Sequence, residues 1–187
     1  MALAQKKHVT YDEYLRMREV NDSIIEYLDG MICMSPSPST KHQRLSGRLN
    51  TKLMIFLEGT ECEVFQAPYD IDLKKEGIEG NKLVIPDLSV ICDKTGLTDN
   101  KYIGVPSLIV EILSPSNQAH DLITKLNIYM QYGVKEYWIV NPLKDAITLY
   151  VLNDEGLYEQ ADVKASKGVV ESTFLKGFKI DLEYLFA

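Results

Sequence analysis

Two apolar runs of strand length each carry one acid in their interior. Residues 83–91, LVIPDLSVI, contain Asp87, and residues 108–113, LIVEIL, contain Glu111. Such runs are typical of central strands that are buried on both faces of a sheet. A carboxylate at such a place costs free energy unless it is paired, protonated or bound to a metal. The chain is therefore expected to form a sheet whose interior holds two acids, each needing a partner.

Pro86 precedes Asp87 and limits the strand pairing that is possible at this point. Proline has no amide hydrogen, so a central strand must bulge or end its pairing at this residue. Either distortion would re-aim the side chain of Asp87. If the two strands are neighbours, Asp87 and Glu111 can reach one cation, and their oxygen atoms suit Mg²⁺ or Mn²⁺ better than zinc or copper.

Capping and turn signals divide the rest of the chain into short elements. Thr10 and Glu13 form a capping box that predicts a short helix, and the Asp29–Gly30 pair predicts a tight hairpin over residues 24–34. The remaining pattern predicts a helix over 121–132, strands over 63–66, 69–73, 136–140, 147–152, 158–163 and 169–174, and a short apolar segment over 182–186.

A long amphipathic helix is predicted from a cap at Ser39 or Thr40 to about Glu58. Its apolar face is formed by Leu45, Leu49, Leu53 and Phe56. Its polar face carries a basic stripe, formed by Lys41, Arg44, Arg48 and Lys52. The sequence leaves two interpretations of this stripe open: a solvated helix face, or a surface that faces phosphate.

Composition limits the class of protein. The 187 residues, 45% of them hydrophobic, fit a single globular domain over 1–187. No apolar run has the length of a signal peptide or a membrane span, so we expect a cytoplasmic protein without membrane contact. The formal net charge of -7 argues against a protein that coats nucleic acid non-specifically. It allows a nuclease, because bound cations neutralise the acids of a metal site.

The three cysteines predict no metal or redox site. Cys33, Cys62 and Cys92 are odd in number and widely spaced, and they lie in apolar or strand-like segments. We therefore expect all three to be buried thiols that act as small core residues.

The helix predicted after Glu111 supplies a candidate cation. Asp121, Lys125 and Tyr129 are spaced by four residues, so they lie on one helical face. Lys125 can then point toward the strand ends, where an ammonium near a phosphate and a metal-bound water can orient the attacking hydroxide and stabilise charge in the transition state. The alternative for Lys125 alone is a solvated ion pair with Asp121.

Several short segments, in this order, resemble one known family. They are residues 25–30 (IEYLDG), Pro86–Asp87, residues 111–116 (EILSPS), the set Asp121, Lys125 and Tyr129, and residues 133–142 (GVKEYWIVNP). This combination, over about residues 8–152, resembles the Uma-two family of endonucleases, which belongs to the PD-(D/E)XK nuclease superfamily.

The resemblance implies an α/β (α+β) fold of the restriction endonuclease-like type, with a mixed central β-sheet flanked by helices and a β-rich C-terminal extension. It also implies a metal site formed by Asp87 and Glu111 and supported by Glu26. The superfamily lysine normally stands two residues after the second acid, which is Leu113 here, so the resemblance assigns that role to Lys125. Two departures, Met31 where Glu is common and Asn141 where Asp is common, remove no proposed ligand.

Weaker candidates surround this set. His42 falls where the family tends to have a histidine, and it can donate a hydrogen bond or handle a proton near a phosphate, or simply contact the preceding loop. Gln66 and Asp70 are weaker still. Tyr137 and Trp138 lie in an apolar strand and are interpreted as core residues.

Two functions of different classes follow. The first is a Mg²⁺- or Mn²⁺-dependent endonuclease that hydrolyses phosphodiester bonds of nucleic acid, with DNA as the expected substrate, through a metal-activated water. The second is a catalytically inactive module that keeps the nuclease fold and binds DNA or a protein partner. A homodimer is also expected, through an apolar surface on the tail after Pro142 that includes Ile147, Leu149 and Val151.

Overall fold

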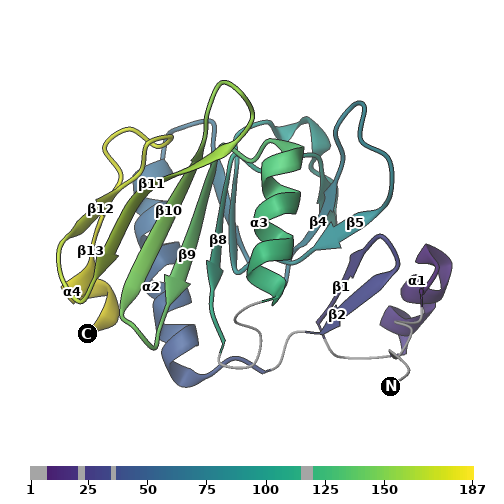
Figure 1. Ribbon diagram of the computed structural model, residues 1–187, viewed down its shortest axis with the longest axis horizontal. Helices are drawn as coiled ribbons and strands as arrows, with labels where there is room; N and C mark the ends of the chain where they lie inside the picture. The colour runs from purple at the N-terminus through teal and green to yellow at the C-terminus, as the bar shows by residue number, and fades with distance from the viewer. Residues whose placement is uncertain (1–7, 21–23, 35–36, 115–119) are drawn as a thin grey trace, which may run out of the picture.

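The computed structural model describes residues 8–20, 24–34, 37–114 and 120–187. Within these ranges the strands form two main sheets and one small sheet (Figure 1). The first sheet has the order β2 (Met31–Met34), β1 (Ile25–Leu28), β5 (Lys82–Val84), β4 (Asp70–Leu73) and β7 (Lys101–Ile103). The second has the order β11 (Tyr158–Ala165), β10 (Ala146–Leu152), β9 (Glu136–Asn141), β8 (Leu108–Ile112), β6 (Leu88–Ile91) and β3 (Glu63–Gln66). The small sheet pairs β12 (Val169–Glu171) with β13 (Lys179–Asp181).

Both main sheets are mixed. β4 pairs in parallel with β7, and β8 pairs in parallel with β9, while the other pairs are antiparallel. The expected class of mixed sheet flanked by helices is therefore confirmed. The strands are divided between two sheets, however, where the sequence led us to expect one central sheet.

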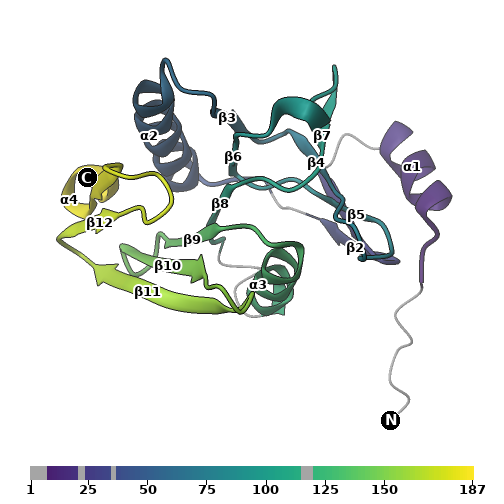
Figure 2. The same ribbon diagram turned by 90° about the horizontal axis from the view of Figure 1, so that it is seen from above.

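The helices of the described ranges are α1 (Tyr11–Glu19), α2 (Thr40–Leu57), α3 (His120–Tyr132) and α4 (Leu182–Phe186). α1 packs beside β1 of the first sheet, and the other helices cover the two faces of the second sheet (Figure 2). Figure 2 shows α2 and α4 on one side of this sheet and α3 on the other. A 3₁₀ turn, Lys94–Gly96, precedes β7. None of the helices in the described ranges is long and apolar enough to span a bilayer.

Local signals fixed most of these boundaries correctly. Thr10 and Glu13 form the predicted capping box of α1, and Ser39 caps α2. Gly133 follows α3 with a φ of +89°, a conformation that suits glycine at a helix end. β7 and β13 were not predicted, because strands of three residues carry too little pattern to be recognised.

The first apolar run, residues 83–91, is not one strand. Its first half forms β5 in the first sheet and its second half forms β6 in the second sheet. The break falls at Ile85–Asp87, where Pro86 offers no amide hydrogen, as expected for a point at which pairing ends. Asp87 therefore stands at the junction of the two sheets.

The long helix α2 buries its leucine face as predicted, with one correction. Leu45, Leu49 and Leu53 lie in the core together with Leu57, whereas Phe56 is 36% exposed. Phe56 packs at the edge of this core, with its ring 5.3 Å from that of Phe178. The inward stripe thus ends on Leu57, four residues after Leu53, since the i+4 position continues that face as well as the i+3 position does.

The basic stripe of α2 contacts the C-terminal part of the chain. Arg48 donates hydrogen bonds to the carbonyl oxygens of Tyr184, Leu185 and Ala187. Lys41 donates to the Pro142 carbonyl and to Asp145, and the ammonium of Lys52 lies over the Tyr184 ring. Arg48 and Lys52 therefore hold residues 184–187 against α2, and Lys41 holds the segment after β9, roles that neither interpretation of the stripe included.

The prediction of three buried thiols is wrong. Cys62 and Cys92 form a disulfide, and the antiparallel pairing of β3 with β6 explains it. Glu63 faces Ile91 in that pairing, so Cys62 and Cys92, one residue further out on each strand, face each other. Cys33 is partly buried and lies outside the disulfide.

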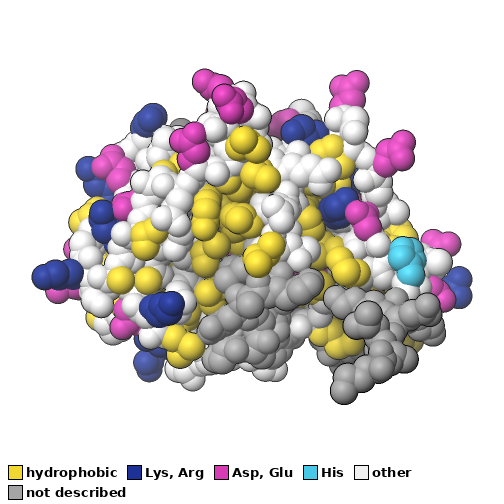
Figure 3. Space-filling view, in the orientation of Figure 1, with side chains coloured by type: hydrophobic (Ala, Val, Ile, Leu, Met, Phe, Trp, Pro, Cys, Tyr) yellow, Lys and Arg dark blue, Asp and Glu magenta, His cyan; other side chains and the backbone are white. Residues whose placement is uncertain are grey.

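The predicted apolar dimer surface is also corrected. Ile147 and Leu149 are buried in the core against α2 and α4, so neither is available to a partner. Figure 3 shows hydrophobic side chains gathered in the middle of the face that presents α3 and β11. Exposed apolar residues of these elements and their loops are Ile123, Leu157 and Val163.

Candidate active site

The junction of the two sheets places Asp87 beside Glu111. β6 pairs antiparallel with β8, and Leu88 faces Val110. The next step of this register brings Asp87 opposite Glu111. The Ile112 amide donates a hydrogen bond of 2.7 Å to Asp87 Oδ2, which holds the aspartate against the end of β8. The two acids that the sequence singled out are therefore neighbours.

Glu111 is a buried acid that lies near both hydrogen-bond donors and other acids. Its Oε1 accepts hydrogen bonds from Lys125 Nζ at 2.9 Å and from the Tyr129 hydroxyl at 2.8 Å. Burial raises the pKa of Glu111 to about 7, because desolvation and the negative charges of Asp87 and Glu26 outweigh the opposing charge of Lys125. Within the described residues Glu111 Oε2 accepts no hydrogen bond from the protein.

Lys125 is held between two acids. Its ammonium lies 3.0 Å from Glu26 Oε2 and 2.9 Å from Glu111 Oε1. Burial opposes its charge, but Glu111 and Glu26 raise the pKa of Lys125 well above its ordinary value. The predicted common face of Lys125 and Tyr129 on α3 is confirmed, since both reach the same oxygen of Glu111. The side chain of Asp121 lies outside the described residues.

Glu26 comes from β1 and links the first sheet to this cluster. Its Oε1 accepts a hydrogen bond of 2.8 Å from the Ile85 amide, and its Oε2 faces Lys125. Glu26 is 2% exposed. Both carboxylate oxygens thus have a protein donor, and the arrangement fixes Lys125 in place.

His42 approaches Asp87 from the first turn of α2. Its Nε2 lies 3.3 Å from Asp87 Oδ1. Burial lowers the pKa of His42, but the contact with Asp87 and its charge outweigh burial, so the net shift is upward. His42 therefore contacts a site residue and is not confined to the preceding loop.

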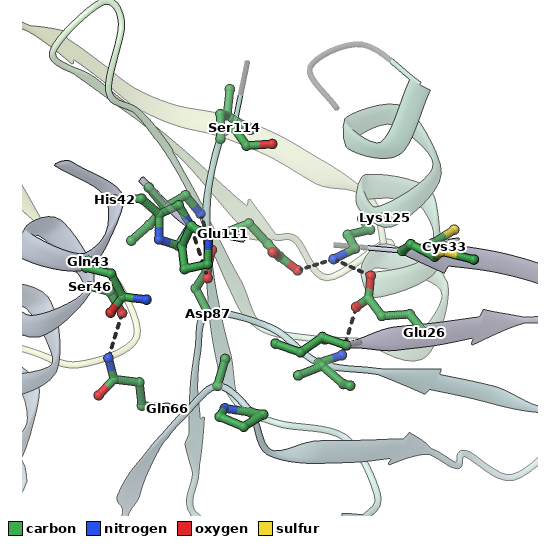
Figure 4. A pocket seen from close by; sticks show the side chains of 18 of the residues that line it. Glu26, Cys33, His42, Gln43, Ser46, Gln66, Asp87, Glu111, Ser114 and Lys125 are labelled. Carbon is green, nitrogen blue, oxygen red and sulfur yellow. Dashed lines mark hydrogen bonds and ion pairs between the residues drawn. The ribbon is translucent and has the colours of Figure 1, made fainter. Parts of the chain in front are cut away.

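One cavity of about 200 Å³ brings these side chains together. Glu26, His42, Asp87, Glu111 and Lys125 all line it, and Figure 4 shows them around a common space. Further lining residues that the sequence did not connect with the site are Cys33, Gln43, Ser46, Ser114 and Tyr137. They come from three elements and a loop that are far apart in the sequence, so spacing along the chain could not have grouped them.

The two weakest candidates separate here. Gln66 lines the cavity and donates a hydrogen bond of 2.9 Å to Ser46 Oγ (Figure 4). Asp70 does not line it, and forms an ion pair with Arg18 of α1 instead. Trp138 is a core residue as predicted, 1% exposed. Tyr137 is equally buried, but it also borders the cavity.

The oxygen atoms of this cavity fit a hard divalent cation. Glu111 Oε2 has no protein donor among the described residues, and Asp87 Oδ1 has only His42 beside it. Across the ranges that the structure describes, no three His, Cys, Asp or Glu residues form a ready-made metal cage. Magnesium commonly binds through one or two carboxylates and takes its other ligands from water and substrate phosphates. The pair Asp87 and Glu111 matches that pattern.

Comparison with known proteins agrees with the fold. An uncharacterized protein of Synechocystis, slr1290, is 31% identical over 174 residues, which cover 92% of this chain and 90% of that protein. A second, sll1609, is 26% identical over 179 residues, covering 94% and 99%. The crystal structure of a "putative nuclease" of the DUF820 group from Anabaena variabilis has a TM-score of 0.74 at 18% identity, over 95% of this chain and 97% of that one, which shows a shared fold. The model of the Uma2 family, described as "Putative restriction endonuclease", matches residues 11–183, and the chain therefore belongs to the Uma2 family.

Proposed function

We propose that this chain is a divalent-metal-dependent endonuclease that hydrolyses phosphodiester bonds, with DNA as its expected substrate. The observation that carries the proposal is the grouping of Asp87, Glu111 and a doubly anchored Lys125 around one cavity. Among the described residues, Glu111 Oε2 has no hydrogen-bond donor from the protein. Burying a carboxylate oxygen without a donor costs folding free energy. Such an arrangement is typical of sites that bind a charged ligand.

Asp87 and Glu111 would hold the metal, Mg²⁺ or Mn²⁺. When bound, the cation would neutralise phosphate charge and activate a water molecule for attack on phosphorus. Glu26 is better suited to a different task, since one of its oxygens is used by the Ile85 amide and the other by Lys125. We therefore propose Glu26 as the residue that holds Lys125, in place of the ligand role that the family resemblance implied.

The other side chains orient these groups. Lys125 presents a permanent positive charge to the transition state, where an anchored cation stabilises the charge that develops on the phosphate. Tyr129 and Lys125 together fix one oxygen of Glu111 and leave the second directed to the ligand. His42 steadies Asp87 and can donate a hydrogen bond near the phosphate.

A second function, an inactive nuclease-fold module that binds DNA or a protein partner, has one observation in its favour. The net charge is -7, and Lys41 and Arg48 of the basic stripe are engaged with the C-terminal part of the chain. Few of its cations are then left for a long stretch of backbone phosphates. A weak or selective grip on nucleic acid is expected in either case.

Metal titration combined with cleavage separates the two functions. Calorimetric titration of Mn²⁺ or Mg²⁺ should show binding to the wild type and a loss of binding in Asp87→Ala. Plasmid DNA should be cleaved by the wild type and left intact by Asp87→Ala. Asp70→Asn is the matched control, because Asp70 is an acid that pairs with Arg18 outside the cavity. Metal binding without cleavage of any nucleic acid would favour the binding module.

The homodimer stays a prediction. If it forms, the exposed apolar side chains around α3 and the β10–β11 hairpin are the surface we expect it to use, in place of the buried Ile147 and Leu149. Light scattering at micromolar concentration measures the mass directly, and a monomer mass would contradict the prediction.

A further inference from the structure

Two buried side-chain atoms among the described residues lack a hydrogen-bond partner, and both belong to residues that line the same cavity. They are the hydroxyl oxygen of Tyr137 and Nδ1 of His42. Buried polar atoms in folded proteins almost always have a partner, because leaving one unpaired costs the full desolvation of that group. Their occurrence around one cavity indicates that a ligand supplies the missing partners.

The sequence pattern predicts Tyr137 as a core residue, and the structure buries it as predicted. It lies on β9, in register with Ile109 of β8 and Tyr150 of β10. Glu111 stands two residues beyond Ile109, so Tyr137 and Glu111 are on the same face of the sheet, beneath α3. The ring of Tyr137 packs edge-on against Tyr129, with 5.1 Å between centroids. Packing therefore accounts for the position of the Tyr137 ring, but it does not account for the buried hydroxyl without a hydrogen-bond partner.

The neighbouring tyrosines show what a satisfied hydroxyl looks like in this cluster. Tyr129 donates to Glu111 Oε1 at 2.8 Å, and Tyr158 donates to the Val134 carbonyl at 2.9 Å. In the part of the chain that the structure describes, the Tyr137 hydroxyl has no such acceptor, although its ring is as deeply buried as that of Tyr129. Burial and the charge of Glu111 raise the pKa of Tyr137, so its hydroxyl stays a neutral donor.

We propose that Tyr137 binds substrate in this site, donating a hydrogen bond to a non-bridging oxygen of the phosphate. This inference rests on the proposed nuclease function. A non-bridging phosphate oxygen only accepts hydrogen bonds, so it complements a lone hydroxyl donor. It also carries the negative charge that the nearby Lys125 ammonium attracts. Tyr137 and Lys125 would then contact the phosphate from the β9 and α3 sides of the cavity.

Tyr137→Phe tests this with the loss of a single oxygen atom. The ring packing is kept, so the variant should fold with a stability equal to or above that of the wild type, because it no longer buries an unpaired donor. Its rate of Mn²⁺-supported plasmid cleavage should fall by about 100-fold, as for the loss of one transition-state donor. Its metal affinity should not change.

Tyr158→Phe is the matched control. It removes a hydroxyl from the same aromatic cluster, and that hydroxyl already has a carbonyl acceptor and does not line the cavity. We expect this control to lose stability and to keep the wild-type cleavage rate. A Tyr137→Phe variant that cleaves like an active wild type would overturn the proposal and leave the nuclease function standing.

A second measurement needs no cleavage. Inorganic phosphate with Mg²⁺ should raise the melting temperature of the wild type and of Tyr158→Phe more than that of Tyr137→Phe. If the wild type cleaves no nucleic acid but shows this difference, the nuclease function fails while Tyr137 stands as a phosphate ligand. Equal shifts in all three proteins, or no shift in any of them, would overturn the role of Tyr137.

Discussion

Two buried glutamates on adjacent strands of the second sheet have opposite surroundings. Glu136 of β9 accepts four hydrogen bonds, from Trp138 Nε1 and Ser172 Oγ at 2.6 Å each, from the Thr173 amide at 2.7 Å and from the Phe174 amide at 2.8 Å. Two donors meet each of its oxygens. Among the described residues, Glu111 of β8 has two donors on one oxygen and none on the other, with two further acids nearby.

The contrast shows that burial of an acid does not by itself mark a functional site. Glu136 is 0% exposed and its charge is dispersed over neutral donors that belong to the chain, so it joins β9 to residues 172–174. Glu111 is only partly satisfied and faces a cavity. We infer that an acid whose hydrogen bonds are complete serves the fold, and that an acid left incomplete beside a cation and a cavity serves a ligand.

A Glu→Gln substitution at each of the two positions tests this contrast, and the larger loss of stability is expected at Glu136. Glu136→Gln replaces one oxygen by an amide NH₂ group that faces two donors, so two hydrogen bonds to a charged acceptor are lost. We expect the free energy of unfolding to fall by about 4 kcal/mol. Urea denaturation measures this, and a loss below about 1 kcal/mol would contradict the structural role.

The next largest effect is expected for the cleavage rate of Lys125→Ala. Lys125→Ala should lower the rate of metal-supported cleavage by about a hundredfold, because it removes a fixed cation from the transition state. Metal binding should change less, since Asp87 and Glu111 are the proposed ligands. Steady-state cleavage and metal titration of this variant beside Asp87→Ala separate the two roles. Cleavage at the wild-type rate in Lys125→Ala would show that another group supplies the charge.

A pH dependence is expected at Glu111. Its pKa is raised from the ordinary 4.5 to about 7, so below about pH 7 the folded protein keeps a proton that the metal must displace. Apparent Mg²⁺ affinity should therefore rise by about fivefold from pH 6 to pH 7 and by no more than about twofold above pH 7. Calorimetry across this range, in buffers of matched ionic strength, measures it. An affinity independent of pH would argue against Glu111 as a ligand.

Much of the fold could be predicted from the sequence because it depends on neighbours in the chain. The capping box at Thr10, the turn at Asp29–Gly30 and the end of α3 at Gly133 are decided within a few residues. The division of residues 83–91 between two sheets could not be predicted, because it depends on which distant strands pair with each half. The Cys62–Cys92 disulfide likewise follows only once β3 and β6 are paired.

The candidate site was likewise predictable only in part. Asp87, Glu111 and Lys125 were identified because each breaks an apolar pattern or matches a family segment, and all three line one cavity. Tyr137 fits its apolar strand well, so its pattern indicates a core residue, and only the missing acceptor of its hydroxyl separates it from Trp138. The structural role of Glu136 could not be predicted either, because three of its four donors come from residues 172–174, up to 38 residues away in the sequence.

Glu111→Gln should have the smallest effect on stability and completes the pair with Glu136→Gln. The amide keeps an oxygen for Tyr129 and Lys125 and removes a charge that Asp87 and Glu26 repel, while Lys125 loses one of its two anionic partners. Since the folded pKa of Glu111 is raised, the wild type loses stability as pH rises from about 4.5 to about 7, and the variant should lack this decline. At pH 5 without metal, where the wild-type carboxyl is protonated, we expect the two proteins to differ by no more than about 1 kcal/mol, and at pH 8 we expect the variant to be the more stable of the two. Urea denaturation at pH 5 and pH 8 measures both quantities, and a loss as large as that of Glu136→Gln would show that Glu111 too serves the fold.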